Sequence, residues 1–437
     1  MVARTIHGVG YATLMRRIGK AQIDERKYRK LAQVAIQATR IPLGEPQRKA
    51  TDALRELVNL SRLTLTDPQD RPALEAMISH FGIEIDQETR ADVLAALPKM
   101  LAAGERLAEQ QKIIDYTDQL YLCYRWQLRP KQFKNVLVDE CQDLGAAQLD
   151  LVLKCRAPGG RIIFVGDPRQ AIMGFAGADA DSFWNIQRRT GATLLPLSVC
   201  YRCPTSHLDM ARSIVPEIEA APGAIAGEIE AIEEEQIGDW IQPGDMIICR
   251  LTAPLVKICI QLIERRMSAR VRGRDIGEQL NAIVRAVTEQ PLYRWEEFGR
   301  WLNTYADRQI DKLAQREGSE NQIESLRDRV EAVRVCYQSF EVESAQQLME
   351  EIEKLFNDDE PDIILSTVHK SKGLENDRIF VLYPEKLPLI WEGQQDWEFS
   401  QEMNLRYVAL TRAKKAMIFI REKPKKKKRR DTFDEAA

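Results

Sequence analysis

The sequence predicts an α/β protein in which two blocks of parallel β-sheet each carry a helical segment. In the first block, β-rich runs at Asn135–Glu140 and Arg161–Asp167 flank a helix-type stretch at Ala146–Lys154. A third β-rich run at Thr193–Leu197 continues the pattern. Strands that alternate with helices are typical of parallel sheets, because each parallel connection needs a crossover.

A second block of the same kind follows the first. The turn Pro243-Gly244 precedes a strand-type run at Asp245–Arg250, and Leu255–Arg266 is then helical. The block resumes much later with three strands and a helix, which are Asp362–Thr367, Arg378–Tyr383, Ala416–Ile420 and Glu402–Lys415.

Two long stretches have only helical periodicity. Residues 24–119 are helical with expected breaks at Pro42-Leu-Gly44, Asp67-Pro68 and Pro98. Residues 280–356 are also helical, and their clearest apolar stripe steps by three and four. The stripe consists of Ile323, Leu326, Val330, Val333 and Tyr337. Such a stripe is most often an ordinary core face.

Composition indicates a globular protein without a membrane partner. The 437 residues are 44% apolar and 30% charged, which is usual for soluble domains. No apolar run approaches the roughly 20 residues that span a bilayer, and the first residues show no signal-peptide core. We therefore expect a cytoplasmic location.

Cysteines and charge add two further expectations. Cys200-Tyr-Arg-Cys203 has C-x-x-C spacing with His207 nearby, but no second ligand pair follows at zinc spacing. Reduced and mostly buried thiols are the favoured interpretation.

Seven of the eight residues in Lys423–Arg430 are basic, whereas residues 1–422 hold 56 basic and 63 acidic side chains. This basic tail is either a solvated disordered arm or a non-specific phosphate contact.

The strongest chemical signal is an acidic pair at the end of a strand. Asp139-Glu140 follows Val136-Leu-Val, and one carboxylate there suits Mg²⁺ while its neighbour suits activation of a water. Acidic pairs end many strands, so the pair alone is weak. The longer pattern is much more specific: D-E-x-Q-D is followed by Val165-Gly-Asp-Pro-Arg-Gln170.

Six segments in order resemble superfamily 1 helicases of the UvrD/Rep type, ATP-driven motors on single-stranded DNA that act in DNA repair and replication. Val138–Asp143 resembles the Walker B element, and the resemblance spans residues 4–415. The other segments are Thr5–Gly8, Gly166–Ala178, Cys200–Pro204, Thr367–Glu375 and Glu402–Ala413.

The resemblance implies two RecA-like parallel-sheet domains with two helical insertions. The first RecA-like domain, incomplete, would comprise residues 1–19 and 115–205, interrupted by a helical insertion at 20–114. The second would comprise residues 206–280 and 357–422, interrupted by an insertion at 281–356, and 423–437 would be the tail.

The resemblance also implies ATP and Mg²⁺ as cofactors and assigns site residues. Asp139 would bind the metal, and the catalytic residues would be Glu140, Gln170, Arg202 and Arg412. Nucleotide contacts would come from Tyr201, Gly373 and Glu375. Contacts with single-stranded DNA would come from Thr5, His7, Phe175, Thr367 and His369, and the sequence does not distinguish DNA from RNA.

Departures from the family pattern limit the expected activity. The sequence holds no G-x-x-x-x-G-K-S/T phosphate loop, and Gly19-Lys20 is no substitute. Met173-Gly-Phe-Ala-Gly177 also lacks an arginine and an aromatic residue that relatives often have. We expect an N-terminally incomplete helicase that hydrolyses ATP poorly alone, with a separate polypeptide as one candidate source of the loop. The alternative is a non-hydrolysing nucleic-acid-binding or regulatory module that retains the helicase scaffold.

Overall fold

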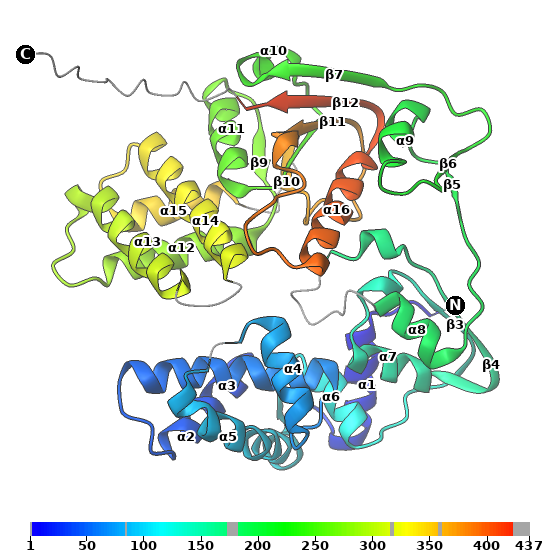
Figure 1. Cartoon of the computed structure of the whole chain (residues 1–437), viewed down its shortest axis with the longest axis vertical. Helices are drawn as coiled ribbons and strands as arrows, with labels where there is room; N and C mark the ends of the chain where they lie inside the picture. Colours follow the sequence, from blue (N-terminus) through cyan, green and yellow to red (C-terminus); the bar gives the residue numbers. More distant parts are fainter. Residues whose placement is uncertain (1, 84, 173–181, 315–318, 357–360, 423–437) are drawn as a thin grey trace, which may run out of the picture. The chain divides into compact units, whose positions relative to one another are not determined.

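The computed structural model describes residues 2–83, 85–172, 182–314, 319–356 and 361–422. Its contacts divide the chain into two compact units, with unit 1 ending at Leu195 and unit 2 beginning at Pro196. Both units mix helices with parallel strands, which confirms the predicted α/β class (Figure 1). Within the described residues no helix is both long enough and apolar enough to cross a membrane.

Unit 1 is mainly helical. The short parallel strands β1 (Gln22–Ile23) and β2 (Ile113–Ile114) pair with each other. Its α-helices are α1 (Ile6–Ile18), α2 (Lys27–Gln37), α3 (Glu45–Thr64), α4 (Arg71–Phe81), α5 (Gln87–Arg106), α6 (Asp118–Arg125), α7 (Ala146–Lys154) and α8 (Ser182–Thr190). The predicted helix Ala146–Lys154 is confirmed as α7.

The predicted break at Pro98 is wrong, because Pro98 lies inside α5. An interior proline costs a helix about 3 kcal/mol, since it removes a hydrogen bond and crowds the preceding turn. Here Leu97 on one side and Met100 on the other are buried in the unit 1 core. Packing of the flanking apolar residues therefore outweighs the local preference.

A buried group of charges joins three parts of unit 1. The guanidinium of Arg62 on α3 donates to both carboxylate oxygens of Asp115, at 2.8 and 2.9 Å, and to Asp118 at 3.1 Å. Lys27 on α2 also binds Asp118, and the Tyr28 hydroxyl donates to Asp118 at 3.0 Å. Two cations thus face two anions, and each carboxylate has several donors, which is the condition under which buried ion pairs persist.

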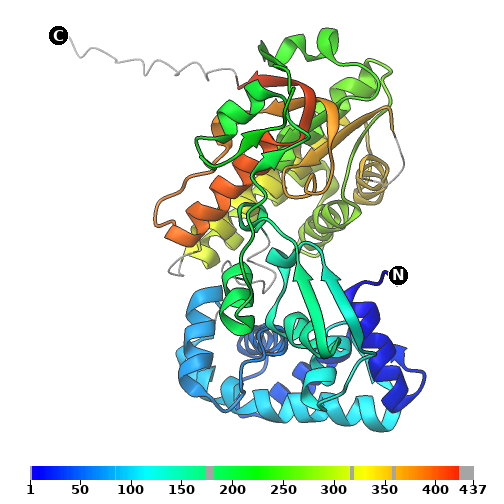
Figure 2. The same cartoon turned by 90° about the vertical axis from the view of Figure 1, so that its right-hand side faces the viewer.

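Strands β3 (Phe133–Val138) and β4 (Arg156–Phe164) form a parallel pair in unit 1 (Figure 2). Val138 faces a small apolar core, whereas Leu137 on the opposite face is 69% exposed. Ile163 and Val165 on that opposite face are also exposed. One face of this strand pair is therefore apolar and uncovered by the described residues.

The third predicted strand of the first block, Thr193–Leu197, is wrong. The first regular strand after β4 is β5 (Val199–Cys200), which pairs in parallel with β6 (Glu219–Ala220). Pro196 interrupts the predicted run, because proline has no backbone N–H for a sheet ladder. Leu195 and Leu197 are 79% and 88% exposed.

Unit 2 contains a six-stranded sheet in the order β7-β12-β11-β8-β10-β9, and every neighbouring pair is parallel. The strands are β7 (Glu228–Glu233), β8 (Met246–Cys249), β9 (Ala269–Val271), β10 (Ile363–Thr367), β11 (Asn376–Leu382) and β12 (Ala413–Arg421). The four predicted strands of this block are confirmed as β8, β10, β11 and β12. Strands β7 and β9 were not predicted.

Helices α9 (Thr205–Ala211), α10 (Ile237–Trp240), α11 (Thr252–Glu264) and α16 (Asp396–Leu410) accompany this sheet. The predicted helix at Leu255–Arg266 is confirmed as α11. The helix predicted over Glu402–Lys415 is real but ends at Leu410, and β12 begins at Ala413. The alanines and lysines of that boundary favour helix locally, but pairing with β11 and β7 makes them a strand.

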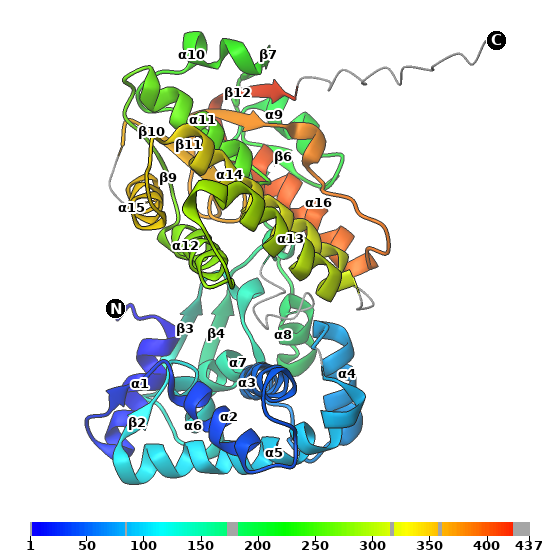
Figure 3. The same ribbon diagram turned by 90° about the vertical axis from the view of Figure 1, so that its left-hand side faces the viewer.

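Four helices form an excursion between the neighbouring strands β9 and β10 (Figure 3). They are α12 (Arg274–Thr288), α13 (Phe298–Ala314), α14 (Glu320–Ser339) and α15 (Ala345–Leu355). The predicted core stripe lies on α14, where Leu326, Val330 and Val333 are buried in the main core of unit 2. That interpretation of the stripe is confirmed.

We predict that Arg62→Leu lowers the free energy of unfolding by about 3–5 kcal/mol, because it leaves Asp115 and Asp118 buried with too few cations. Urea denaturation measures the change. Arg55→Leu on the same helix is the control, since the Arg55 side chain is 50% exposed and lies 3.9 Å from Asp52. An equal loss in both variants would contradict a structural role for the buried group.

Candidate functional site

The candidate site in unit 1 lies at the carboxyl ends of β3 and β4. The residues Asp139 and Glu140 follow β3, and Gly166–Gln170 follow β4. Backbone bonds hold these two ends together: Val165 N donates to Val138 O at 2.8 Å, and Cys141 N donates to Val165 O at 3.0 Å. Parallel pairing thus brings the two predicted motifs to one edge.

Gln142 connects the motifs through its side-chain amide. It is 1% exposed, its Nε2 donates to Glu140 Oε2, and its Oε1 accepts from Asp167 N at 3.1 Å. Asp167 Oδ2 in turn accepts from Gln170 Nε2 at 2.9 Å. A continuous hydrogen-bonded chain therefore runs from Glu140 through Gln142 and Asp167 to Gln170.

Sequence reasoning missed Gln142 and Asp167 as positioning residues. Both residues belong to the motifs described above. The sequence signal that could have found them is their spacing: Gln142 is an amide close to Glu140, and Asp167 is a carboxylate close to Gln170. Asp167 also accepts from the backbone N of Arg169 at 2.9 Å, which holds the turn Pro168–Gln170 in shape.

Glu140 has a left-handed backbone with φ of 51°, which few non-glycine residues adopt. Its N–H donates to Asp139 Oδ1 at 3.0 Å, and both residues are exposed in unit 1. Strain of this kind persists where surrounding bonds hold it, as the Gln142 amide does here. The sharp turn presents two neighbouring carboxylates at the strand end.

Gly166 is required by the close approach of the two loops. A Cβ at this position would lie 2.4 Å from Gln142 Oε1 and 2.7 Å from Cys141 Sγ. Any larger residue would displace the amide that positions Glu140. The glycine of the V-G-D-x-x-Q motif thus has a steric explanation.

The residues present fit a magnesium ion. Mg²⁺ prefers oxygen ligands and commonly takes one or two carboxylates together with waters and substrate phosphates. The exposed carboxylates of Asp139 and Glu140 supply such oxygens. Waters and phosphates would supply the other ligands, since over the residues that the structure describes no group of three or more His, Cys, Asp or Glu side chains is arranged to bind a metal ion.

A second group of predicted site residues lies within unit 2. Arg202 Nε lies 2.5 Å from Glu375 Oε2, and Lys414 Nζ lies 2.7 Å from Glu375 Oε1. The hydrogen bond from Lys414 and the charge of Arg202 lower the pKa of Glu375. Sequence reasoning did not assign Lys414. Tyr201, beside Arg202, is 82% exposed, so its ring is open to a stacking partner.

Arg412 is buried rather than presented at the surface of unit 2, with 1% exposure. Its guanidinium donates to the carbonyl oxygens of Val408 at 2.9 Å and Leu374 at 3.2 Å, and to Thr411 Oγ1 at 3.1 Å. Arg202 donates to the Thr411 carbonyl at 3.4 Å, so both arginines are held beside the same turn. Residues 196–205, which the sequence prediction grouped with the first block, make these contacts in unit 2.

Gly373 has a φ of 80°, which a residue with a side chain rarely adopts. The turn that contains it follows Thr367 at the end of β10. Thr367 is 7% exposed, and its hydroxyl accepts from Lys370 N at 3.3 Å. This hydrogen bond shapes the turn.

The two predicted DNA-contacting histidines both have a lowered pKa. Burial, with the charges of Arg250 and Lys370, lowers the pKa of His369 to about 3. Burial also lowers the pKa of His7. His369 is therefore uncharged at neutral pH. Thr5 caps α1 by accepting from Gly8 N at 3.1 Å, and Phe175 lies outside the described residues.

Cys200 and Cys203 differ sharply in acidity. A hydrogen bond from the Cys203 thiol and two backbone N–H groups lower the pKa of Cys200 to about 5. The same hydrogen bond, with burial, raises the pKa of Cys203. All eight cysteines are free thiols, and Cys200 is only partly buried, whereas the others are buried.

Comparison with known families agrees with this geometry. Residues 68–423 match the model of the UvrD-like helicase C-terminal domain. The chain belongs to the UvrD-like helicase family. The predicted family is thereby confirmed.

Individual relatives are more distant. The chain is 25% identical over 343 residues to F-box DNA helicase 1 of Gallus gallus, covering 67% of this chain and 30% of that protein. It is 25% identical over 191 residues to DNA helicase II of Escherichia coli strain K12, covering 38% and 25%. DNA helicase II of Salmonella typhimurium is 28% identical over 129 residues, covering 27% and 18%. The match thus spans less than a third of each relative.

We predict that Gln142→Glu destabilises unit 1, because the new carboxylate cannot donate to Glu140 and repels it. Burial favours the protonated form of the new carboxyl group, so the loss of stability should be larger at pH 8 than at pH 5. Urea denaturation at the two pH values measures this. Gln148→Glu is the control, since Gln148 Oε1 only accepts, from Gly145 N at 2.9 Å, and a carboxylate can replace it. A loss of stability in Gln142→Glu that is the same at both pH values would contradict the proposed hydrogen bond from Gln142 to Glu140.

We predict that iodoacetamide alkylates Cys200 faster than any other cysteine. With a pKa of about 5, Cys200 is a thiolate above that pH, so its rate should be nearly flat from pH 6 to 8. In Cys203→Ala the thiol donor to Cys200 is lost, and we expect the rate to rise with pH over that range. Peptide mapping by mass spectrometry gives the rates, and a steep pH dependence in the unmodified chain would contradict the prediction.

Proposed function

We propose that this chain forms the main part of an ATP-dependent helicase that moves on single-stranded DNA. The observation that carries the proposal is the hydrogen-bonded chain Glu140–Gln142–Asp167–Gln170 at one sheet edge. It places a carboxylate and an amide in fixed relation, as phosphoryl transfer to water requires. Family membership supports the same activity.

In the proposed mechanism Glu140 orients and deprotonates the attacking water, and Gln170 contacts the terminal phosphate. Asp139 would hold Mg²⁺, which would neutralise charge on the phosphates. Gln142 and Asp167 act through these residues by fixing their positions.

The proposed nucleotide contacts in unit 2 include Tyr201, Gly373 and Glu375, and the catalytic cations are Arg202 and Arg412. Glu375 binds Arg202 and Lys414 in the structure. We propose that this ion pairing fixes the position of the Arg202 side chain before nucleotide binds. Glu375 would then exchange Arg202 and Lys414 for a ribose hydroxyl of the nucleotide. Arg412 would have to leave its carbonyl partners to reach a phosphate.

We further propose that hydrolysis needs a phosphate-binding loop from outside residues 1–437, since the sequence holds no G-x-x-x-x-G-K-S/T motif. The exposed apolar side chains Leu137, Ile163 and Val165 support this, because they offer a face that a further strand or helix would cover. Either a neighbouring segment or a separate polypeptide could supply the loop. We also propose the RecA-like domain boundaries given under Sequence analysis.

For the nucleic acid we propose single-stranded DNA, with Thr5, His7, Thr367 and His369 along its path and Phe175 stacking on a base. The neutral state of His369 supports base or sugar contact rather than phosphate contact. Base stacking on an aromatic residue is worth about 1–3 kcal/mol and tolerates any sequence.

We predict that the purified chain binds labelled oligo(dT), measured by fluorescence anisotropy, and releases phosphate from Mg·ATP slowly or not at all. Glu140→Gln should leave oligo(dT) binding unchanged, because Glu140 acts on water and not on DNA. Vigorous turnover abolished by Glu140→Gln would refute the need for an external loop while supporting the ATPase site.

The rival function, a non-hydrolysing binding module, makes a different prediction. Phosphate release would then stay absent even when the chain is extended by, or mixed with, a segment that carries the missing loop. DNA-stimulated release that appears on such addition and disappears with Glu140→Gln would support the helicase. A chain that binds no single-stranded nucleic acid would overturn the helicase and the nucleic-acid-binding module, and would leave a regulatory module that retains the helicase scaffold.

A further inference from the structure

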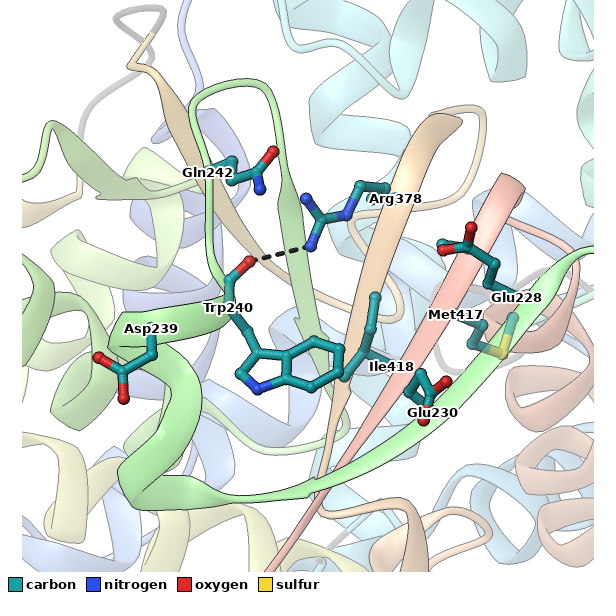
Figure 4. Close-up of a pocket in the computed structure, with 9 residues that line it drawn as sticks. Glu228, Glu230, Asp239, Trp240, Gln242, Arg378, Met417 and Ile418 are labelled. Atoms are coloured by element: carbon teal, nitrogen blue, oxygen red, sulfur yellow. Dashed lines mark hydrogen bonds between the residues drawn. The ribbon is translucent and has the colours of Figure 1, made fainter.

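A groove of about 360 Å³ lies on the six-stranded sheet of unit 2, and its lining includes none of the residues assigned above (Figure 4). Its floor is the register row in which Glu228 on β7 lies beside Ala416 on β12, and Ala416 lies beside Arg378 on β11. Ile418 and Glu230 form the next row on the same face of the sheet, two positions along the strands. These rows belong to the strand edge of the sheet, because β7 is its outermost strand.

Three acidic residues line this groove. Glu228, Glu230 and Asp239 are all exposed. Across the described part of the chain, no cationic side chain lies within ion-pair distance of these three carboxylates. The cation that lines the groove, Arg378, is engaged elsewhere: it donates to the carbonyl of Trp240 at 2.9 Å and lies 3.6 Å from Asp245.

An aromatic wall accompanies the carboxylates. Trp240 at the end of α10 is 37% exposed, and its indole points over the strands next to Ile418 (Figure 4). A partly exposed indole beside carboxylates suits the ammonium and methylene groups of lysine, by cation–π attraction and by packing of the side-chain stem. Phosphates would be repelled, so a nucleic acid is a poor occupant.

The chain itself carries a segment of matching charge. Strand β12 ends at Arg421, which is paired with Glu233 of β7, and the basic run begins two residues later at Lys423. Return from Arg421 to the level of Ala416, the farther row of the groove, covers about 17 Å at the rise of a strand. The eight residues Lys423–Arg430 reach up to about 26–29 Å when extended. The run is therefore long enough to lie along the groove.

We propose that residues 423–430 dock in cis on the acidic groove formed by Glu228, Glu230, Asp239 and Trp240. Attachment to β12 gives the segment a high effective concentration, which favours it over the tail of a second copy. A docked tail has fewer lysines to offer to phosphates. The groove thereby restrains non-specific nucleic-acid binding by the tail, and a polyanion competes with the groove for it.

Zero-length carbodiimide cross-linking of the full chain, followed by peptide mapping, tests the contact. We expect amide links from Lys423 and Lys425–Lys428 to Glu228, Glu230 or Asp239, weakened by salt and independent of protein concentration. The proposal would be overturned if the tail lysines linked to other surface carboxylates instead of the groove, and if this pattern were unchanged in a Glu228→Gln/Glu230→Gln variant. Links between two copies that increase with concentration would overturn docking in cis.

Oligonucleotide binding gives an independent readout. The variant Glu228→Gln/Glu230→Gln/Asp239→Asn should bind oligo(dT) about fivefold more tightly at low salt, as expected from the loss of a few exposed ion pairs. The control Glu278→Gln/Asp307→Asn/Glu341→Gln removes equal charge from exposed positions on and next to the helical excursion and should change affinity less.

The difference between the groove variant and the parent should vanish when Lys425–Lys428 are all changed to Gln. A gain that survives this change, or an equal gain in the control, would refute the proposal. The cross-linking arm involves neither ATP nor DNA, so its outcome does not depend on the proposed helicase activity.

Discussion

Parallel pairing is the constraint on which the arrangement of both units depends. Every strand pair among the described residues is parallel. Parallel neighbours need a crossover between them, so the helices are long connections rather than separate layers added to a finished sheet. The same pairing collects strand ends at a common edge, and this is how Asp139 and Gln170, far apart in sequence, come to lie at one site.

The two groups of candidate residues are held by different physics. In unit 1 a neutral amide, Gln142, positions charged groups without adding charge, and Gly166 provides the space for it. In unit 2 the groups are charged and pair with one another, as Arg202, Glu375 and Lys414 do. The first arrangement fixes geometry through a neutral side chain, whereas the second holds two cations beside one carboxylate.

Elements with a strong local pattern could be predicted from the sequence, such as α7 and the wholly apolar β8. Elements defined by their neighbours could not. Strand β7 has glutamate at three of its six positions, a residue type that is depleted in strands, and it has a partner strand on one side only, and β9 has three residues. Leu195 and Leu197 resemble a strand but lie outside the strands of the structure, and Pro98 resembles a break but lies in a packed helix. For the site, motif order led to Glu140 and Gln170 as candidates, while the bridging contacts of Gln142 emerge only when β3 and β4 are placed side by side.

The order of strands in the unit 2 sheet has a consequence for how the protein is made. Both neighbours of the central strand β8 are translated after it, on the far side of the four-helix excursion, and β7 pairs only with β12, the last strand described. Such long sequence separations slow folding and leave strand edges open on a growing chain. Strand β7 therefore stays unpaired until β12 has been translated. Its glutamates keep this open strand edge charged, which disfavours pairing with other chains.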